Sequence, residues 1–209
     1  MQIVKAHAQI CGDVDGQEIL KKIEAAGRIC HKSEKNITED SCEEFISRII
    51  RMGHESVLEH ASVTVKFVAD RGVSHEIVRH RLASYCQEST RYCNYGKEGF
   101  GSEITVIKPC FLTVGTDKWE LWRDACAMSE RFYFDMLDCG CTPQEARAVL
   151  PNSLKTELVM TANLREWRTF FKLRTAKTAH PQMREVARPL LDDFKKAIPV
   201  IFDDVTYEK

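Results

Sequence analysis

The sequence predicts one mixed α/β domain of the α+β type over residues 1–209, with a central, largely antiparallel sheet flanked by helices. Apolar residues recur at the helical period in residues 17–31 and 39–52, and Gly53 closes the second of these predicted helices. Residues 61–69 instead alternate strictly between apolar and polar side chains, which predicts a half-buried strand. The chain shows no internal repeat or low-complexity segment, so a single domain is expected.

An arginine-rich segment follows the predicted strand. From residue 74 to about residue 84, apolar residues recur at helical spacing, which places Arg79-His80-Arg81 on a helix. On a helix, Arg79 and Arg81 point to nearly opposite sides, so they are expected to contact different groups. Residues 88–102 contain three glycines and few aliphatic residues, which predicts a loop able to fold over a ligand.

The middle of the chain predicts a short strand and two helices. Residues 104–107 are expected to form the strand, and residues 116–137 a long helix with an aromatic side. Thr142-Pro143-Gln144-Glu145 has the form of a capping box with proline at the first helical position. The short helix that it begins ends before Pro151 and presents Arg147.

Alternation over residues 156–162 favours a strand in a stretch that also permits a helix. Asn163 then predicts the N-cap of a helix whose apolar stripe of Trp167, Phe170 and Phe171 ends at Arg174. A last helix is expected from about Pro181, with a kink at its internal proline.

The composition limits the function classes. A net charge of −1 argues against a general nucleic-acid-binding protein, and no apolar run approaches the length of a membrane span. The start of the sequence lacks the pattern of a signal peptide, so a cytoplasmic location is expected. The nine cysteines form no C-x-x-C pair, and the histidines fall on different elements, so we expect reduced thiols and no metal.

The segment from Arg79 to Arg91 is suited to a polyanionic ligand, because guanidinium groups bind phosphate through a bidentate fork. Ser89 lacks the G-x-S-x-G setting of a nucleophile and is interpreted as a phosphate-binding hydroxyl. No P-loop or G-x-G-x-x-G pattern is present, so phosphates would be held by side chains. Asn163 fits a helix cap at least as well as a ligand-binding role, and a guanidinium at Arg174 needs an acceptor if it is buried.

This segment also resembles a known signature. Arg79-His80-Arg81, then seven residues, then Ser89, with Arg91-Tyr92 following, is similar to the signature of the flavin-dependent thymidylate synthases. Further segments resemble the same family in order and spacing from about residue 53 to residue 188. They are Gly53-His54-Glu55-Ser56, Glu59-His60, Glu145-Ala146-Arg147, Leu150-Pro151, Thr161, Asn163, Arg165, Leu173-Arg174, Ala179 and Arg184.

The resemblance implies two sets of site residues. The set expected to bind dUMP consists of Glu76, Arg79, Gln87, Glu88, Ser89, Arg91, Arg147 and Arg174. The set expected to contact FAD consists of Ser56, Arg79, His80, Arg81, Asn163 and Arg165. Arg174 is the expected catalytic residue, because a fixed cation near the N3 and O2 edge of uracil would stabilise charge that develops there. His54 and His80 are expected to help position folate or flavin.

The resemblance also implies the activity: dTMP biosynthesis by reductive methylation of dUMP, without a cysteine nucleophile. Methylenetetrahydrofolate would donate the carbon, and FAD reduced by NADPH would supply the hydride. The implied assembly is a homotetramer with shared active sites. The sequence departs from the common family pattern at Glu76, Thr169, Thr178 and the run from His180 to Arg184, which affects expected flavin contacts.

The sequence also permits two other interpretations. Pro109-Cys110 superficially matches a thymidylate synthase of the cysteine-nucleophile class, although its surroundings do not. Arg79, Arg81, Arg91, Tyr92 and Tyr95 could instead serve a nucleotide- or single-stranded-RNA-binding module. The choice between NADPH and NADH is also open.

Overall fold

The computed structural model describes residues 1–96 and 101–208. Contacts divide the chain into two compact units. Unit 1 comprises Met1–His7, Phe67–Arg79 and Cys86–Leu158, and unit 2 comprises Ala8–Lys66, His80–Tyr85 and Val159–Lys209. A single domain over the whole chain stays a prediction.

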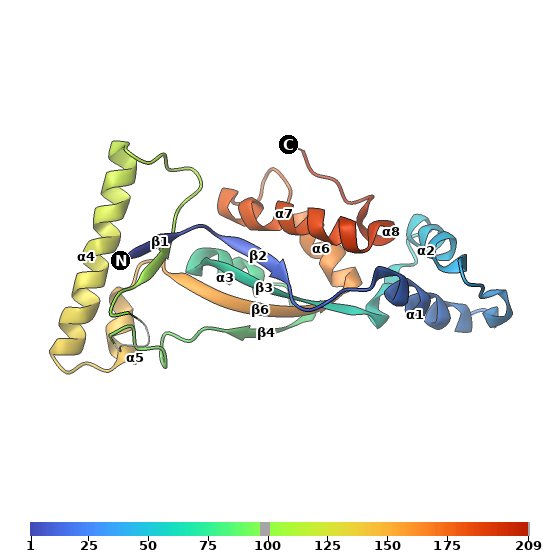
Figure 1. The fold of residues 1–209 in the computed structure, drawn as a ribbon, viewed down its shortest axis with the longest axis horizontal. Helices are drawn as coiled ribbons and strands as arrows, with labels where there is room; N and C mark the ends of the chain where they lie inside the picture. The colour runs from blue at the N-terminus through green and yellow to red at the C-terminus, as the bar shows by residue number, and fades with distance from the viewer. Residues whose placement is uncertain (97–100, 209) are drawn as a thin grey trace. The chain divides into compact units, whose positions relative to one another are not determined.

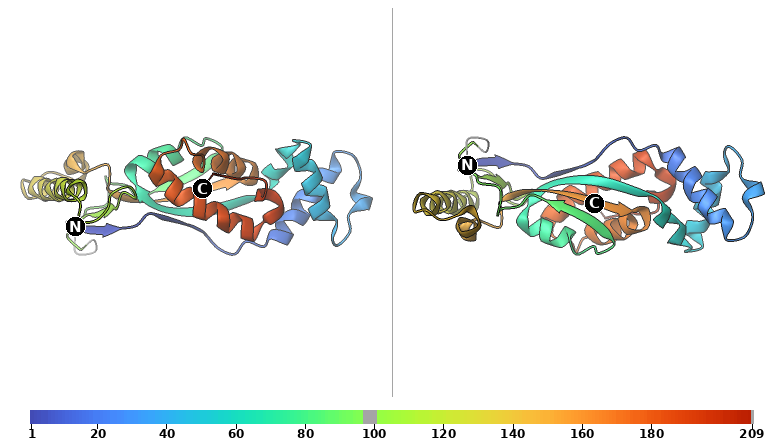
Figure 2. Two further views of the ribbon diagram at one scale, coloured as in Figure 1. Left: turned by 90° about the horizontal axis from the view of Figure 1, so that it is seen from above. Right: turned by 90° about the horizontal axis from the view of Figure 1, so that it is seen from below.

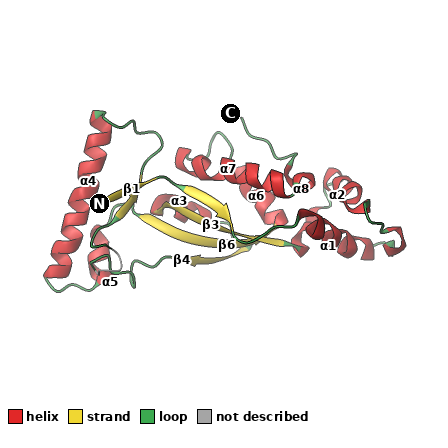
Figure 3. Ribbon diagram, in the orientation of Figure 1, coloured by secondary structure: helices red, strands yellow, loops and turns green. Residues whose placement is uncertain are grey.

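The main sheet has four strands in the order β2-β3-β6-β4, which are His7–Ile10, Ser62–Asp70, Lys155–Asn163 and Ala83–Gln87. It is an antiparallel sheet flanked by helices, which confirms the predicted fold class (Figure 3). Both long strands alternate as expected, with Val63, Val65, Leu158 and Met160 buried. A separate two-stranded sheet pairs β1 (Gln2–Val4) with β5 (Thr105–Ile107) in parallel.

In its described residues, unit 1 contains three helices and a short 3-10 helix. They are α3 (Arg71–Ile77), α4 (Asp117–Asp138), α5 (Pro143–Ala146) and η4 (Arg147–Val149), and α4 and α5 lie beside β1 (Figure 1). Trp119, Cys126 and Tyr133 form the buried side of α4 at spacings of seven residues. Trp119 lies against Trp122 with ring centroids 4.9 Å apart. The predicted capping box at Thr142 is confirmed.

Unit 2 contains the remaining helices: α1 (Gly16–Ile29), η1 (Glu34–Asn36), α2 (Ser41–Arg51), η2 (Glu55–His60), α6 (Leu164–Arg174), α7 (Pro181–Ala197) and α8 (Pro199–Phe202). Trp167, Phe171, Phe194 and Phe202 form a fully buried aromatic cluster. The indole of Trp167 donates to the carbonyl of Val63, which fixes α6 on β3. Helix α7 covers one face of the strands of this unit, as the two opposite views show (Figure 2).

The prediction that the arginine-rich segment lies on a helix reaching to about residue 84 is wrong. Helix α3 ends at Ile77, and Arg79-His80-Arg81 lie in the connection to β4. The apolar residues that suggested a longer helix, Val78 and Leu82, are 38% and 70% exposed, so they do not form a packing face. The opposite directions expected for Arg79 and Arg81 therefore have no helical basis. The predicted loop over residues 88–102 has no helix or strand in its described part, and residues 97–100 lie outside the described residues.

Candidate functional site

A cavity of about 600 Å³ in unit 1 collects positively charged and polar side chains. Its lining includes Arg71 and His75 from α3, Thr90 from the following loop, and Arg147 from η4. The guanidinium of Arg147 donates to the hydroxyl of Thr90 at 3.2 Å. Two guanidinium groups on one cavity favour a phosphate-bearing ligand, because Arg keeps its charge when partly buried. The capping box of α5 fixes the turn that delivers Arg147 to this place.

The loop beside this cavity is held by hydrogen bonds to α3 and β6. Arg71 donates to the carbonyl of Glu88 at 3.3 Å and to the hydroxyl of Thr156 at 3.4 Å. The amide of Gln87 donates to the hydroxyls of Ser74 and Thr156 at 3.0 and 3.2 Å. Gln87 and Glu88, which were predicted to bind nucleotide, are thus held by hydrogen bonds within unit 1.

The carboxylate of Glu88 is fully engaged within unit 1. Its Oε1 accepts a 2.9 Å hydrogen bond from the hydroxyl of Tyr95, and its Oε2 lies 3.0 Å from the ammonium of Lys155. Burial disfavours the charged form of Lys155, but the carboxylates of Glu88 and Glu157 outweigh this and raise its pKa. Burial, together with the charge of Glu88, raises the pKa of Tyr95. Glu88 therefore supports the loop, a role that the sequence could not reveal.

The other predicted dUMP residues of unit 1 lie on α3 and on the loop. Glu76 lies on α3, and Arg79 follows this helix with an exposed side chain. The hydroxyl of Ser89 accepts from the backbone N–H of Arg91 at 3.3 Å. Arg91 is exposed and lies over the ring of Tyr92. All predicted dUMP residues except Arg174 belong to unit 1.

In unit 2, a buried imidazole connects Glu166 to Arg174. Nδ1 of His80 lies 2.9 Å from Glu166 Oε1, and Nε2 of the same ring accepts from Nε of Arg174 at 3.1 Å. Because Arg can only donate, Nε2 must be unprotonated, and the proton sits on Nδ1 facing Glu166. Burial lowers the pKa of His80, and the positive charge of Arg174 lowers it further against the opposing effect of Glu166. The neutral ring thus fixes the guanidinium of Arg174 at the end of the aromatic stripe of α6.

Tyr85 holds the backbone of His80 by a hydrogen bond. Its hydroxyl donates to the carbonyl of His80 at 2.6 Å. Burial and then the charge of Glu166 raise the pKa of Tyr85 to about 12. The phenol therefore remains a donor at neutral pH and holds the backbone of the arginine-rich segment.

Asn163 confirms its predicted role as a helix cap, since its Oδ1 accepts from the N–H of Glu166 at 2.9 Å. Arg165 pairs with Glu59 of η2 at 2.6 Å, and both side chains are about half exposed. Arg81 is exposed. Except for Arg79, the residues predicted to contact FAD all belong to unit 2.

A second cavity, of about 470 Å³, lies between α1, α2 and η2 of unit 2. Ser56 and His54, both predicted from the resemblance, line it together with Phe45 and Arg48. At its inner side the ring of Phe45 packs on Gly27, where an added Cβ would lie 2.8 Å from ring atoms. No residue of the helices predicted over residues 17–31 and 39–52 was expected to belong to a site, so Gly27, Phe45 and Arg48 were missed.

The guanidinium of Arg168 fixes the start of η2. It is 1% exposed, pairs with Glu55 at 3.0 Å and Asp204 at 2.6 Å, and also donates to the carbonyl of Ile201. The hydrogen bond from Arg168 lowers the pKa of Asp204. Since Glu55 precedes Ser56, these contacts of the buried Arg168 hold the edge of the second cavity in place.

Within residues 1–96 and 101–208, no group of three or more His, Cys, Asp or Glu side chains could hold a metal ion. No helix in this described part is both long and apolar enough to cross a membrane.

Comparison with solved structures shows the same fold. A UMP/dUMP methylase, PolB from Streptomyces cacaoi, bound with 5-Br dUMP, superposes with a TM-score of 0.79. The two share 24% sequence identity over 97% of this chain and 96% of the other.

Sequence comparisons identify the family. The profile described as "Thymidylate synthase complementing protein" matches residues 15–200. A flavin-dependent thymidylate synthase of Pyrococcus furiosus is 36% identical over 166 residues, which cover 79% of this chain and 67% of the relative. Those of Geobacter sulfurreducens and Corynebacterium glutamicum are 33% and 32% identical over 86% and 94% of this chain, and the matches cover 78% and 82% of these relatives. The chain therefore belongs to the family of flavin-dependent thymidylate synthases.

Proposed function

We propose that this chain converts dUMP to dTMP as an FAD-dependent thymidylate synthase, with methylenetetrahydrofolate as carbon donor and NADPH as reductant. In the overall reaction, the methylene carbon and one hydride replace the proton at C5 of uracil as a methyl group. The observation that carries the proposal for dUMP is the cationic cavity of unit 1, which Arg71 and Arg147 both line, together with Thr90 of the loop that carries Ser89 and Arg91. A nucleoside monophosphate offers the dianion that this cavity would neutralise.

Ser89, Arg91 and Arg147 are the proposed phosphate ligands. Gln87, Glu76 and Arg79 would contact the nucleoside from the neighbouring elements. The carboxylate of Glu88 is already paired with Tyr95 and Lys155, so its proposed role is to hold the loop rather than to bind nucleotide through its side chain.

Arg174 is the proposed catalytic residue. Its guanidinium is fixed by the neutral ring of His80, and it would lie against the N3 and O2 edge of uracil. Negative charge that builds up on this edge when C5 forms a bond to carbon would be stabilised by the fixed cation. Such activation needs no cysteine nucleophile in the chain.

The second cavity fits a flavin dinucleotide in its chemistry. It combines an apolar floor at Phe45 and Gly27 with polar groups at Ser56, His54 and Arg48. Ser56, Arg79, His80, Arg81, Asn163 and Arg165 are the proposed FAD contacts. When bound, FAD supplies the hydride that completes the methyl group. Asn163 would contribute through its amide nitrogen, because its oxygen caps α6.

His54 and His80 are proposed to help position folate or flavin. We also propose one catalytic domain over residues 1–209, a homotetramer with shared active sites, a cytoplasmic location, and no requirement for metal or nucleic acid. The near-neutral net charge of −1 supports small-molecule substrates over a strand of nucleic acid.

The decisive experiment follows the anaerobic visible spectrum of the purified protein with dUMP, before and after NADPH, and then measures dTMP after methylenetetrahydrofolate is added. The expected result is an oxidised-flavin band that bleaches and returns with formation of dTMP. Cys110→Ala should keep this activity, which excludes the cysteine-nucleophile route. A protein that stays colourless after reconstitution with FAD would overturn the proposal. Steeply salt-dependent binding of single-stranded RNA would then support the nucleic-acid interpretation.

A further inference from the structure

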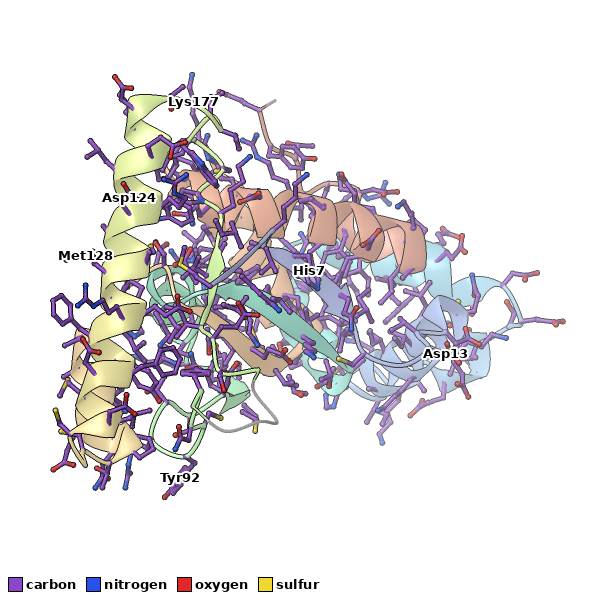
Figure 4. All side chains as sticks on the ribbon, turned by 60° about the vertical axis from the view of Figure 1, so that its left-hand side comes forward. His7, Asp13, Tyr92, Asp124, Met128 and Lys177 are labelled. Carbon is purple, nitrogen blue, oxygen red and sulfur yellow. The ribbon has the colours of Figure 1, made fainter. Side chains whose placement is uncertain are left out.

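Helix α4 carries an apolar stripe on the side that faces away from the core of unit 1. Leu121, Met128 and Phe132 are 72%, 53% and 49% exposed, and Ala125 between them is also exposed. Met128 projects outward from the helix in Figure 4. The buried side of α4 carries Trp119, Cys126 and Tyr133 instead. Single exposed apolar residues are ordinary, but a continuous line of them on one helix indicates a contact surface.

The spacing of this outer stripe (Leu121, Ala125, Met128 and Phe132) is four, three and four residues. This is the alternation of a heptad seam, in which one helix packs along another. The stripe therefore matches a helical partner better than a flat apolar surface.

We propose that the outer stripe packs antiparallel on the same stripe of a second copy of this chain. A two-fold axis through the middle of the stripe sets Leu121 against Phe132 of the second copy and Ala125 against Met128 of the second copy. Near the centre, the small side chain of Ala125 then leaves room for the larger Met128, and at the ends two large apolar side chains pack on each other. A symmetric pair of this kind uses one surface twice, as closed homodimers do.

Charges on one flank of the outer stripe favour this arrangement. Asp124 and Arg131 lie on the same side of the stripe, one heptad apart. With a rise of about 1.5 Å per residue, the two-fold axis brings Asp124 to within roughly 3 Å, along the helix, of Arg131 of the second copy. The symmetric contact repeats, so each interface gains two opposite-charge pairs. In a parallel pair, the same Asp124 would face the flank that carries Ser129, and no such pairs would form.

The present partners of these charges are weak competitors. Asp124 pairs with Arg123 at 2.8 Å, and Arg131 lies 3.7 Å from Asp135. All four side chains are between 45% and 75% exposed. Exposed ion pairs contribute little to stability, so these side chains can turn to a second copy at small cost.

The proposal assigns one surface to the assembly proposed above, and it is tested by mass rather than by activity. The full-length protein and its variants would be studied by size-exclusion chromatography with light scattering at micromolar concentration. Asp124→Arg alone and Arg131→Asp alone should each raise the dissociation constant at least about tenfold, because each creates two like-charge contacts. Arg123→Asp, which makes the same charge change off the stripe as Arg131→Asp, should leave the mass unchanged.

Mixing Asp124→Arg with Arg131→Asp should restore the assembly, because both cross-contacts between the two variants are attractive. Met128→Glu should also lower the mass, and neither charge variant should rescue it. Far-UV circular dichroism verifies that each variant is folded. A wild-type protein that is monomeric at 24.0 kDa, single reversals that keep the wild-type mass, or a mixture that stays dissociated would each overturn the proposal. None of these outcomes depends on flavin content or on thymidylate formation.

Discussion

Nε of Arg174 donates a 3.1 Å hydrogen bond to Nε2 of His80, and this contact fixes the tautomer of a buried ring. The ring must be neutral to accept from a guanidinium. Protonation of Nε2 would replace an acceptor by a donor and set two positive charges against each other. The position of the proposed catalytic cation therefore depends on an uncharged histidine.

This dependence predicts a loss of stability in mild acid. The pKa of His80 is lowered from its ordinary value of 6.5, so below pH 6.5 the unfolded chain binds a proton that the folded chain does not. The contribution of neutral His80 to the free energy of unfolding is complete above pH 6.5, and it is lost as the pH falls from 6.5 through the pKa of His80 in the folded chain. For this one group, the free energy of unfolding falls by at most about 1.4 kcal/mol per pH unit. Urea unfolding from pH 7.5 to pH 5 would measure it.

His80→Gln should flatten this slope, and His7→Gln should not, because His7 is exposed. Equal slopes in the wild type and His80→Gln would contradict the assignment of a neutral buried ring.

Arg147→Ala should weaken dUMP binding by about 10- to 100-fold, since a hydrogen bond to a charged group contributes roughly 1.5–3 kcal/mol. The flavin content should not change, because Arg147 lies on the cavity of unit 1. Isothermal titration with dUMP measures the effect. Arg51→Ala, an exposed arginine at the end of α2, is the matched control. Unchanged dUMP affinity in Arg147→Ala would remove this cavity from the substrate site.

Tyr95→Phe and Lys155→Met should both loosen the loop of Ser89 and Arg91, because each removes one partner of the Glu88 carboxylate. We expect the KM for dUMP to rise about tenfold with a smaller change in kcat, since ground-state contacts are affected. The double variant should show less than the sum of the two effects, because both act through one carboxylate. Lys177→Met, at an 81% exposed lysine, should have wild-type kinetics. A fall in kcat with unchanged KM would argue for a chemical role of this group.

Gly27→Ala should reduce flavin occupancy. Its Cβ would lie 2.8 Å from the ring of Phe45, so the ring must move within the second cavity. Flavin content from visible absorbance should fall, although Ala stabilises a helix relative to Gly by up to about 1 kcal/mol. Ala25→Gly, on the exposed side of the same helix, should lower stability without changing flavin affinity. Full flavin occupancy in Gly27→Ala would separate this cavity from flavin binding.

The long periodic elements could be predicted from the sequence. Helix α4, with Thr116 as its N-cap, and the alternating strands β3 and β6 carry their own signals, because the period of buried residues is set by local geometry. The short strands β1, β2 and β4 could not be predicted, since three to five residues form a strand only when a distant partner supplies the hydrogen bonds.

The residue types of the candidate site were visible in the sequence, but their partners were not. Helix α3 ends at Ile77, and His80 three residues later is buried against Glu166, a residue 86 positions away that no local pattern reveals. The engagement of Glu88 by Tyr95 and Lys155 likewise requires the tertiary fold. Gly27 of α1 and Phe45 of α2 are buried residues of their helices. A helix that only packs and a helix that lines a cavity show the same periodic pattern in sequence, so no local pattern distinguishes these roles.

The distribution of the three tryptophans has an optical consequence. Trp119 and Trp122 lie together in unit 1, where the indole of Trp122 donates to Ser153, whereas Trp167 lies in the aromatic cluster of unit 2. Since the sequence contains no other tryptophan, Trp167→Phe confines the tryptophan fluorescence to unit 1. Emission from this variant and from one with Phe at both Trp119 and Trp122 would follow the melting of each unit separately. The chain thus carries built-in reporters that show whether the two units lose their structure in one step or in two.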